Sequence, residues 1–360
     1  GDNQKYNNIF DKVATIGGEI DVVKMDMSYF TWHTSDNDMF NNKLIDLIGF
    51  PPRFKDEPIE QHHKDLAASL QRWYESALYF IINRITNTWE CENLVLGGGC
   101  AYNGTANGKI KQFTAIKNVF IPFAPSDSGS AIGACLYHYH QTFGNPKVKG
   151  GDNQSPYLGE EWSSPELLKI ILQNHRSKVV MYDTDDVLCK EVAKLINEGN
   201  IVGWFQGRTE FGARALGNRS ILGNPHLSDI RDRINKVVKK REMFRPFAPS
   251  VTIEDYQKYF LSEEDVPYMN QVVKVKKDVN IPSVTHVDNS ARIQTLKRED
   301  NPLYYDLLKE FEKLTGTPIL LNTSFNLKDH TMTNDPQKAI WTFHNCDMDY
   351  LVLGKFLISK

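Results

Sequence analysis

The stretches WFQGRTEFGARALGNRSI (residues 204–221) and KKREMFRPFAPS (residues 239–250) place cations between glycines and aromatic side chains. From Arg208 to Arg245 the chain carries ten Lys or Arg residues but only four Asp or Glu residues. Glycines let a backbone approach a ligand closely, and the apolar neighbours indicate that the arginines are partly enclosed. A guanidinium group presents a rigid fork of donors that suits carboxylate and phosphate oxygens. The pattern therefore predicts a site for a small, multiply charged anion, with an ordinary solvated basic surface as the alternative for any single cation.

The length of 360 residues predicts two domains with ample core. The formal net charge of −3 argues against a dedicated nucleic-acid-binding protein, because phosphate neutralisation needs a basic face. The basic excess of residues 208–245 is opposite in sign to the whole chain, so it indicates a local site. We expect no nucleic-acid partner.

The five cysteines are scattered and form no CxxC pair. A disulfide framework or a zinc knuckle is therefore not expected, and a reducing cytosol is the natural environment. The sequence has no apolar run of about 18 residues, and its first 30 residues lack a signal-peptide core. We expect a cytoplasmic protein with no membrane partner, and the sequence leaves a homo-oligomer open.

The order of predicted elements indicates a mixed α/β fold. Residues 59–84 have the apolar spacing of a long helix. The strand CENLVLGGG is followed by a predicted helix over residues 103–112, and the strand VFIPFAP leads into a helix rich in small residues. Residues 144–165 are rich in Gly, Pro and Ser, which favours a linker. The remainder alternates strands with helices. We predict a first domain over 1–150, a linker over 151–175 and a second domain over 176–360.

Two further candidate features lie in the first domain. Gly97, Gly98 and Gly99 follow an apolar strand, where backbone N–H groups can face a phosphate, although turns use glycine anyway. Asp127 follows the next strand at the start of a helix, where a carboxylate can bind a metal or simply cap the helix.

Three segments of the second domain carry residues that are suited to binding an anion. Lys239, Arg241 and Arg245 come first, Arg292 is the only cation of HVDNSARIQT, and ILLNTSFN ends a strand in polar residues that include Ser324 and Asn326. Short hydroxyl and amide side chains hold anions or sugar hydroxyls, and they are also common in turns. Together these junctions favour one anion pocket over separate structural roles.

These motifs resemble one known family, the O-carbamoyltransferases of nodulation-factor and antibiotic biosynthesis. The resemblance rests on six ordered segments and covers residues 20–360. They are LVLGGGCAYNGTANG, FIPFAPSDSGSAIGA, GRTEFGARALGNRSI, KKREMFRPFAP, HVDNSARIQT and LLNTSFN. The resemblance implies part of an actin/sugar-kinase-like carbamoyl-transfer domain, followed by a YrdC-like domain that forms carbamoyl-adenylate from carbamoyl phosphate and ATP. The carbamoyl group then passes to a hydroxyl group of a small molecule, a sugar or a natural product.

The resemblance also implies roles for individual residues and cofactors. Lys239, Arg241 and Arg214 would be catalytic. The residues for carbamoyl phosphate and the adenylate would be Arg214, Lys239, Arg245, Arg292, Ser324 and Asn326. Gly97, Gly98 and Asn103 would form the nucleotide or substrate loop, and Asp127 would bind a divalent metal. That metal would be Fe²⁺ or Mn²⁺, with Mg²⁺ accompanying ATP.

Two departures from the family pattern qualify this expectation. Ala213 stands where the family usually has proline, which alters only the turn. The early part of the first domain, which carries the family's metal-binding histidines, has no counterpart in this sequence. We therefore expect a piece of a longer protein with an incomplete metal site, whose activity in isolation is doubtful. The alternatives are a sugar-kinase-like phosphotransferase, which leaves residues 204–245 unexplained, and a non-catalytic partner module that retains the fold.

Overall fold

The computed structural model describes residues 1–18, 22–54, 57–147, 155–174 and 177–360, and it divides the chain into two compact units. Unit 1 comprises residues 1–94 and 109–119, and unit 2 comprises residues 95–108 and 120–360. The expected mixed α/β class is confirmed. The predicted boundary near residue 150 stays a prediction, and residues 151–154 and 175 of the predicted linker lie outside the described residues.

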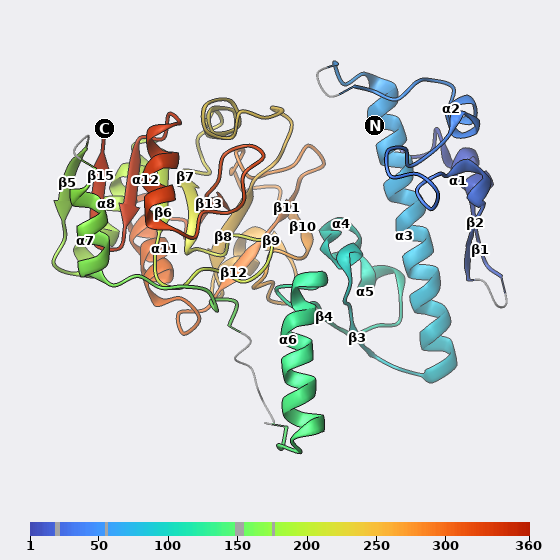
Figure 1. The fold of residues 1–360 in the computed structure, drawn as a ribbon, viewed down its shortest axis with the longest axis horizontal. Coiled ribbons are helices and arrows are strands. Elements are labelled where there is room, and N and C mark those ends of the chain that lie inside the picture. The colour runs from blue at the N-terminus through green and yellow to red at the C-terminus, as the bar shows by residue number, and fades with distance from the viewer. Residues whose placement is uncertain (19–21, 55–56, 148–154, 175–176) are drawn as a thin grey trace. The chain divides into compact units, whose positions relative to one another are not determined.

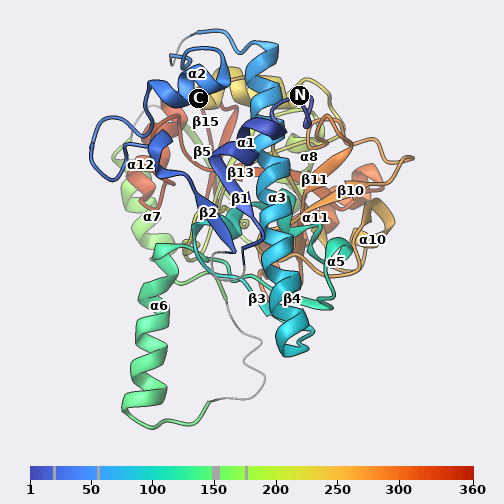
Figure 2. The same ribbon diagram turned by 90° about the vertical axis from the view of Figure 1, so that its right-hand side faces the viewer.

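Unit 1 is built on the long helix α3 (Gln61–Trp89), which is conspicuous in Figure 2. The helix begins with a capping box between Glu60 and His63, and it ends at Glu90 in the left-handed conformation. The carboxylate of Asp65 fixes the chain start to α3, since it accepts the Asp2 N–H at 2.8 Å and pairs with Lys5 at 3.0 Å. The other elements of unit 1 are α1 (Asn7–Val13), β1 (Ala14–Ile16), β2 (Val23–Met25), η1 (Met27–Tyr29), α2 (Asn42–Ile48) and α5 (Ile110–Phe113).

Unit 2 contains an eight-stranded sheet in the order β12-β8-β13-β7-β6-β14-β15-β5 (Figure 1). Only the pairs β12–β8 and β14–β6 are parallel. The strands are β5 (Lys178–Met181), β6 (Val202–Phe205), β7 (Arg219–Gly223), β8 (Ala248–Thr252), β12 (Gln294–Leu296), β13 (Ile319–Ser324), β14 (Tyr350–Leu353) and β15 (Phe356–Ser359). A three-stranded sheet joins β9 (Phe260–Leu261), β10 (Val272–Val275) and β11 (Ser290–Arg292). A two-stranded sheet joins β3 (Asn93–Val95) and β4 (Asn118–Phe120).

Helices bury both faces of the eight-stranded sheet, and the strand sequences alternate accordingly. Val202 and Trp204 of β6 pack with α8 (Asp185–Asn197) and α11 (Pro302–Thr315). Phe205 packs in the core of the opposite face, with α7 (Ser164–Leu172), α12 (Pro336–His344), α9 (Ile230–Arg233) and the π-helix η4 (Ile234–Lys239). Each such apolar side chain contributes roughly 1.5–3 kcal/mol when it is fully buried. The large sheet is therefore a rigid support for loops at its strand ends.

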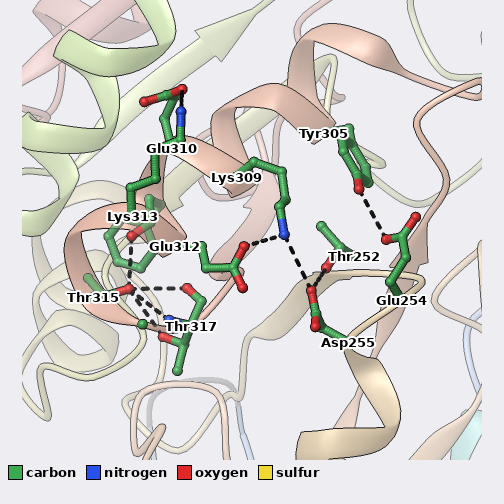
Figure 3. A network of polar contacts seen from close by, with 12 residues as sticks. Thr252, Glu254, Asp255, Tyr305, Lys309, Glu310, Glu312, Lys313, Thr315 and Thr317 are labelled. Atoms are coloured by element: carbon green, nitrogen blue, oxygen red, sulfur yellow. Dashed lines mark hydrogen bonds and ion pairs between the residues drawn. The ribbon is translucent and has the colours of Figure 1, made fainter.

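The outer side of α11 is tied to the segment that follows β8 (Figure 3). Thr252 donates to the Asp255 carboxylate at 2.8 Å, and Lys309 of α11 lies 3.6 Å from the same carboxylate. Burial raises the pKa of Asp255, but hydrogen bonds from Lys258 and Thr252, together with attraction to Lys309 and Lys258, leave that pKa below its usual value. Tyr305 of α11 donates to Glu254 at 3.1 Å. These contacts fix α11 against the end of β8.

Two helical segments are interrupted, the predicted helix over residues 103–112 and the segment of residues 230–239. Residues 99–113 form η2 (Gly99–Tyr102), α4 (Gly104–Asn107) and α5, because α4 packs closely on β10: a Cβ atom on Gly108 would lie 2.0 Å from the Val272 carbonyl oxygen. Residues 230–239 form α9 and then η4, whose end at Lys240 has a φ of 47°. π-helical turns often accompany functional sites. The remaining elements are α6 (Asp127–Tyr137), the π-helix η3 (His138–Thr142) and α10 (Tyr256–Tyr259).

Candidate anion site

The loop between β6 and β7 follows a path that requires glycine. Gly207, Gly212 and Gly217 have φ angles of 43°, 128° and 111°. A Cβ atom on Gly217 would lie 2.2 Å from the Tyr304 ring, and one on Gly212 would lie 2.8 Å from the Phe123 carbonyl oxygen. Arg214 lies between these last two glycines, so the backbone that carries it has little freedom.

A buried carboxylate holds the same loop in place. Glu210 is 4% exposed, and its Oε1 atom accepts the N–H groups of Leu216 at 2.8 Å, Asn218 at 2.8 Å and Arg219 at 3.2 Å. The carbonyl oxygen of Leu216 accepts Tyr157 Oη–H and Gln294 Nε2–H, each at 2.9 Å. Glu210 thus positions the loop, a role that the sequence did not single out.

Arg219, which the sequence places among the candidate cations, is structural. It is fully buried, its guanidinium group lies 3.7 Å from the centre of the Phe205 ring, and it donates to backbone carbonyl oxygens of Gly207 and Glu160. Most of its donors are directed to the chain itself, so it offers little to a ligand.

Arg214 and Arg292 differ from Arg219 in their hydrogen bonds, since four backbone carbonyl oxygens accept from the Arg219 guanidinium group. Among the residues that the structure describes, no carboxylate forms an ion pair with any of these three arginines. The Nε atom of each is buried without a hydrogen-bond partner in the described part of the chain. Burial lowers the pKa of Arg214, and interaction with Tyr102 opposes that shift. Burial also lowers the pKa of Arg292 to about 9, with further repulsion from Arg214 and Arg241. Buried cations without counter-charge are costly, so this cluster favours an anion.

Lys239 joins the end of η4 to the end of β13. Lys239 is 3% exposed, and its ammonium group donates to Asn326 Oδ1 at 2.6 Å, to Ser324 Oγ at 3.3 Å and to the carbonyl oxygens of both residues. Ser324 Oγ donates to Asn326 Oδ1 at 2.6 Å. Burial, and then repulsion from Arg241, hold the pKa of Lys239 well below its usual value. The structure thus brings together three candidate residues from two distant motifs.

Arg241 and Arg245 follow Lys239 but are held differently. Arg241 donates to Asn235 Oδ1 at 2.8 Å and lies 5.0 Å from the centre of the Phe247 ring. Burial, with repulsion from Arg245, lowers the pKa of Arg241 to about 10. Arg245 is half exposed and pairs with Glu242 at 2.9 Å. Arg245 therefore already has a counter-charge, unlike Arg214 and Arg292.

The glycine turn 97–99 also belongs to unit 2. Gly98 needs glycine because its φ is 90°, and its N–H donates to the Pro125 carbonyl oxygen at 2.6 Å. No heavy atom lies within 4 Å of a Cβ built on Gly98, and the nearest to one on Gly97 is 4.0 Å away. Asn103 Oδ1 accepts the Ala106 N–H at 3.1 Å and so caps α4. The adjacent Tyr102, which the sequence did not single out, places its ring 5.2 Å from the Arg214 guanidinium group.

Asp127 is exposed and is the first residue of α6. The preceding Ser126 makes no side-chain capping bond, and Asp127 supplies negative charge to the first helical turn. Among the described residues, no group of three or more His, Cys, Asp or Glu side chains is arranged to hold a metal ion. The described residues therefore provide at most one ligand here, and both the metal and the role of Asp127 stay predictions.

Comparison with known proteins identifies the class. The family model for the carbamoyltransferase N-terminus matches residues 3–136, and that for the carbamoyltransferase C-terminus matches residues 193–360. The chain therefore belongs to the carbamoyltransferase family, as the motifs predicted. No helix among the described residues is both long and apolar enough to span a bilayer.

Two relatives illustrate this membership. The chain is 39% identical to nodulation protein NolNO of Sinorhizobium fredii, over 86% of this chain and 46% of the relative. It is 33% identical to 3'-hydroxymethylcephem-O-carbamoyltransferase of Amycolatopsis lactamdurans, over 72% of this chain and 48% of the relative. The chain thus spans about half the length of these relatives. A solved structure of HypF in the phosphate- and nucleotide-bound form is 17% identical over 66% of this chain and 27% of its own, with a TM-score of 0.34.

Proposed function

We propose that this chain is part of an ATP-dependent O-carbamoyltransferase. Carbamoyl phosphate, ATP and one water molecule would give carbamoyl-adenylate, phosphate and pyrophosphate. The hydroxyl oxygen of an acceptor would then bond to the carbamoyl carbon while the bond from that carbon to the AMP oxygen breaks. The relative from Amycolatopsis lactamdurans is a 3'-hydroxymethylcephem-O-carbamoyltransferase, and its hydroxymethyl acceptor supports this class of acceptor.

The observation that carries the proposal is the pair Arg214 and Arg292. Both side chains are partly buried and have no carboxylate partner among the described residues, and each has a buried Nε atom without a hydrogen-bond acceptor there. Carbamoyl phosphate and ATP are both multiply charged anions and repel each other. Fixed cations in a site of low dielectric offset this repulsion and stabilise charge that develops during transfer.

Lys239, Ser324 and Asn326 support the same chemistry. The charge of Lys239 is surrounded by neutral acceptors, so it adds to the positive potential rather than cancelling it. In this conformation Lys239 donates to the chain, which favours a role in shaping the end of β13. Carbamoyl-adenylate is labile in water, so an enclosed site would also protect it.

The remaining assignments belong to the proposal as well. Arg241 and Arg245 would flank the adenylate, and Gly97, Gly98 and Asn103 would border the substrate. ATP would bind with Mg²⁺. A further divalent metal, Fe²⁺ or Mn²⁺, would need ligands beyond Asp127, so we derive no step through it. The cytoplasm is the proposed location.

The test is exchange of labelled pyrophosphate into ATP, measured on the complete natural protein. Exchange should depend on carbamoyl phosphate, and it should disappear in Lys239→Ala and in Arg214→Ala. A phosphotransferase would instead release ADP and show no pyrophosphate exchange. A folded protein that lacks exchange, or variants that retain it, would contradict the proposal.

A further inference from the structure

Tyr102 connects the glycine turn to the arginine cluster. Its ring lies 5.2 Å from the Arg214 guanidinium group. A cation over an aromatic ring gains about 0.5–1 kcal/mol at exposed sites and about 2 kcal/mol when it is desolvated. The ring therefore helps to hold a charged guanidinium group in a buried place.

The position of Tyr102 is set by a rigid support. The side-chain amide of Asn107 donates to the Ala101 carbonyl oxygen at 2.7 Å and to the Asn270 carbonyl oxygen at 2.8 Å. Asn270 in turn donates to the Ile121 carbonyl oxygen at 2.8 Å. These buried hydrogen bonds tie the residue before Tyr102 to the segment that leads into β10.

The same support reaches Arg292. Gly108 lies so close to β10 that a Cβ atom there would be 2.0 Å from the Val272 carbonyl oxygen. Val272 is the partner of Arg292 in the antiparallel pairing of β10 with β11. Tyr102, Arg214 and Arg292 are therefore positioned by segments that pack directly on one another within unit 2.

The hydroxyl group of Tyr102 is buried without a hydrogen-bond partner among the described residues, as are the Nε atoms of Arg214 and Arg292. A buried polar group that stays unpaired costs about 1–3 kcal/mol. Tyr102 interacts with Arg214, and Arg214 and Arg292 repel each other. No carboxylate of the described chain accepts from the Tyr102 hydroxyl group or from either Nε atom. These three donors match an oxyanion that accepts from all of them.

We propose that Tyr102 is a residue of the anion site, in which its ring positions Arg214 and its hydroxyl group donates to a phosphate-type oxyanion. This proposal deepens the proposed function and rests on it for the identity of the anion as carbamoyl phosphate. Binding of an oxyanion is measurable without turnover, so the two proposals can fail separately.

The experiment is calorimetric titration of the complete natural protein with inorganic phosphate and with pyrophosphate. Tyr102→Phe keeps the ring and removes the hydroxyl group, whereas Tyr102→Leu removes both. Loss of a hydrogen bond to a charged group should weaken binding roughly tenfold in Tyr102→Phe. Loss of the ring should weaken it about fivefold further in Tyr102→Leu. Tyr137→Phe, at a tyrosine of α6 that is 69% exposed, is the matched control and should bind as the wild type does.

A purely structural role would lower the melting temperature of the Tyr102 variants but leave the phosphate affinity of the folded protein unchanged. Unchanged affinity in Tyr102→Phe, or a wild-type protein that binds neither anion, would overturn the inference. Tyr102→Phe decides the hydroxyl contact even if Tyr102→Leu does not fold. Pyrophosphate exchange by the wild type reports separately on the proposed function.

Discussion

The ammonium group of Lys239 lies 2.6 Å from the amide oxygen of Asn326, a residue 87 positions further along the chain. All the hydrogen-bond acceptors described for this ammonium group are neutral: the side chains and carbonyl oxygens of Ser324 and Asn326. The lysine is thus fully hydrogen-bonded while its charge remains uncompensated. A buried cation of this kind raises the local potential without needing direct contact with the ligand.

Replacement of Asn326 by Asp tests this relationship. The new carboxylate would lie beside Lys239, raise the pKa of that lysine and cancel its charge. We expect affinity for phosphate, and the KM for carbamoyl phosphate, to worsen about tenfold, which corresponds to about 1.4 kcal/mol. Asn345→Asp adds the same charge at an exposed position and should change neither value. Equal or tighter phosphate binding in Asn326→Asp would argue against the electrostatic role of Lys239.

The sequence predicted elements whose signals are local. The sequence Ser164-Pro165-Glu166 predicts a helix start with Ser164 as the cap; α7 does begin at Ser164, but its cap is Ser163, which forms a capping box with Glu166. The apolar stripe of residues 188–196 predicts a helix from about Asp185, where α8 begins. Interruption of the predicted helix 103–112 was not foreseeable, because it depends on the packing of Gly104 and Gly108 against β10, far along the chain. Periodicity alone does not include such tertiary contacts.

The sequence likewise predicted only part of the candidate site. Glycines and aromatic residues around Arg214 and Lys239 indicated enclosure; Lys239 is buried and Arg214 is partly buried. Nothing in the sequence separates Arg245, which pairs with Glu242, from Arg292, which has no carboxylate partner in the described chain. Glu210 was visible only as one acid among many cations. Its role depends on three N–H groups that converge on it after folding.

Gly217→Ala should destabilise the protein by more than about 2 kcal/mol, because a β-carbon would overlap the Tyr304 ring and a φ of 111° disfavours alanine. Urea denaturation followed by circular dichroism measures the change. Gly99→Ala is the matched control, since no heavy atom lies within 4 Å of its β-carbon, and it should stay within about 0.5 kcal/mol of the wild type. Similar values for the two variants would contradict the steric explanation.

Glu210→Ala should cost about 3 kcal/mol, since it leaves the buried N–H groups of Leu216, Asn218 and Arg219 without their acceptor. Glu210→Gln keeps an oxygen at the same place and should cost about 1 kcal/mol. If Glu210 positions Arg214, phosphate affinity should fall in the alanine variant and largely recover in the glutamine variant. Equal loss of stability in both variants would show that the charge, rather than the acceptor geometry, supports the loop.

The alkaline limit of activity should depend on Arg292. Its pKa in the folded protein is about 9, below the usual value of 12.5, so between these two pH values the unfolded chain binds more protons at this group. The contribution of Arg292 to stability therefore rises with pH over that interval. Anion binding has the opposite dependence, because it needs the charged guanidinium group. We expect kcat/KM for carbamoyl phosphate to fall above about pH 9, and kcat to fall only at higher pH, since a bound anion raises the pKa of Arg292.

Arg292→Lys tests whether the alkaline limit of activity comes from Arg292 or from Lys239, whose pKa is also lowered. A lysine has a lower intrinsic pKa than an arginine, and the same burial would lower it further, so the alkaline limb of kcat/KM should move to lower pH. Arg298→Lys is the control, because Arg298 is exposed and already paired with Asp306 at 3.0 Å, and its profile should match that of the wild type. The measurement is kcat/KM from pH 6 to about pH 10 for the three proteins. An alkaline limb that stays in place in Arg292→Lys would assign the titration to another group and remove Arg292 from the anion site.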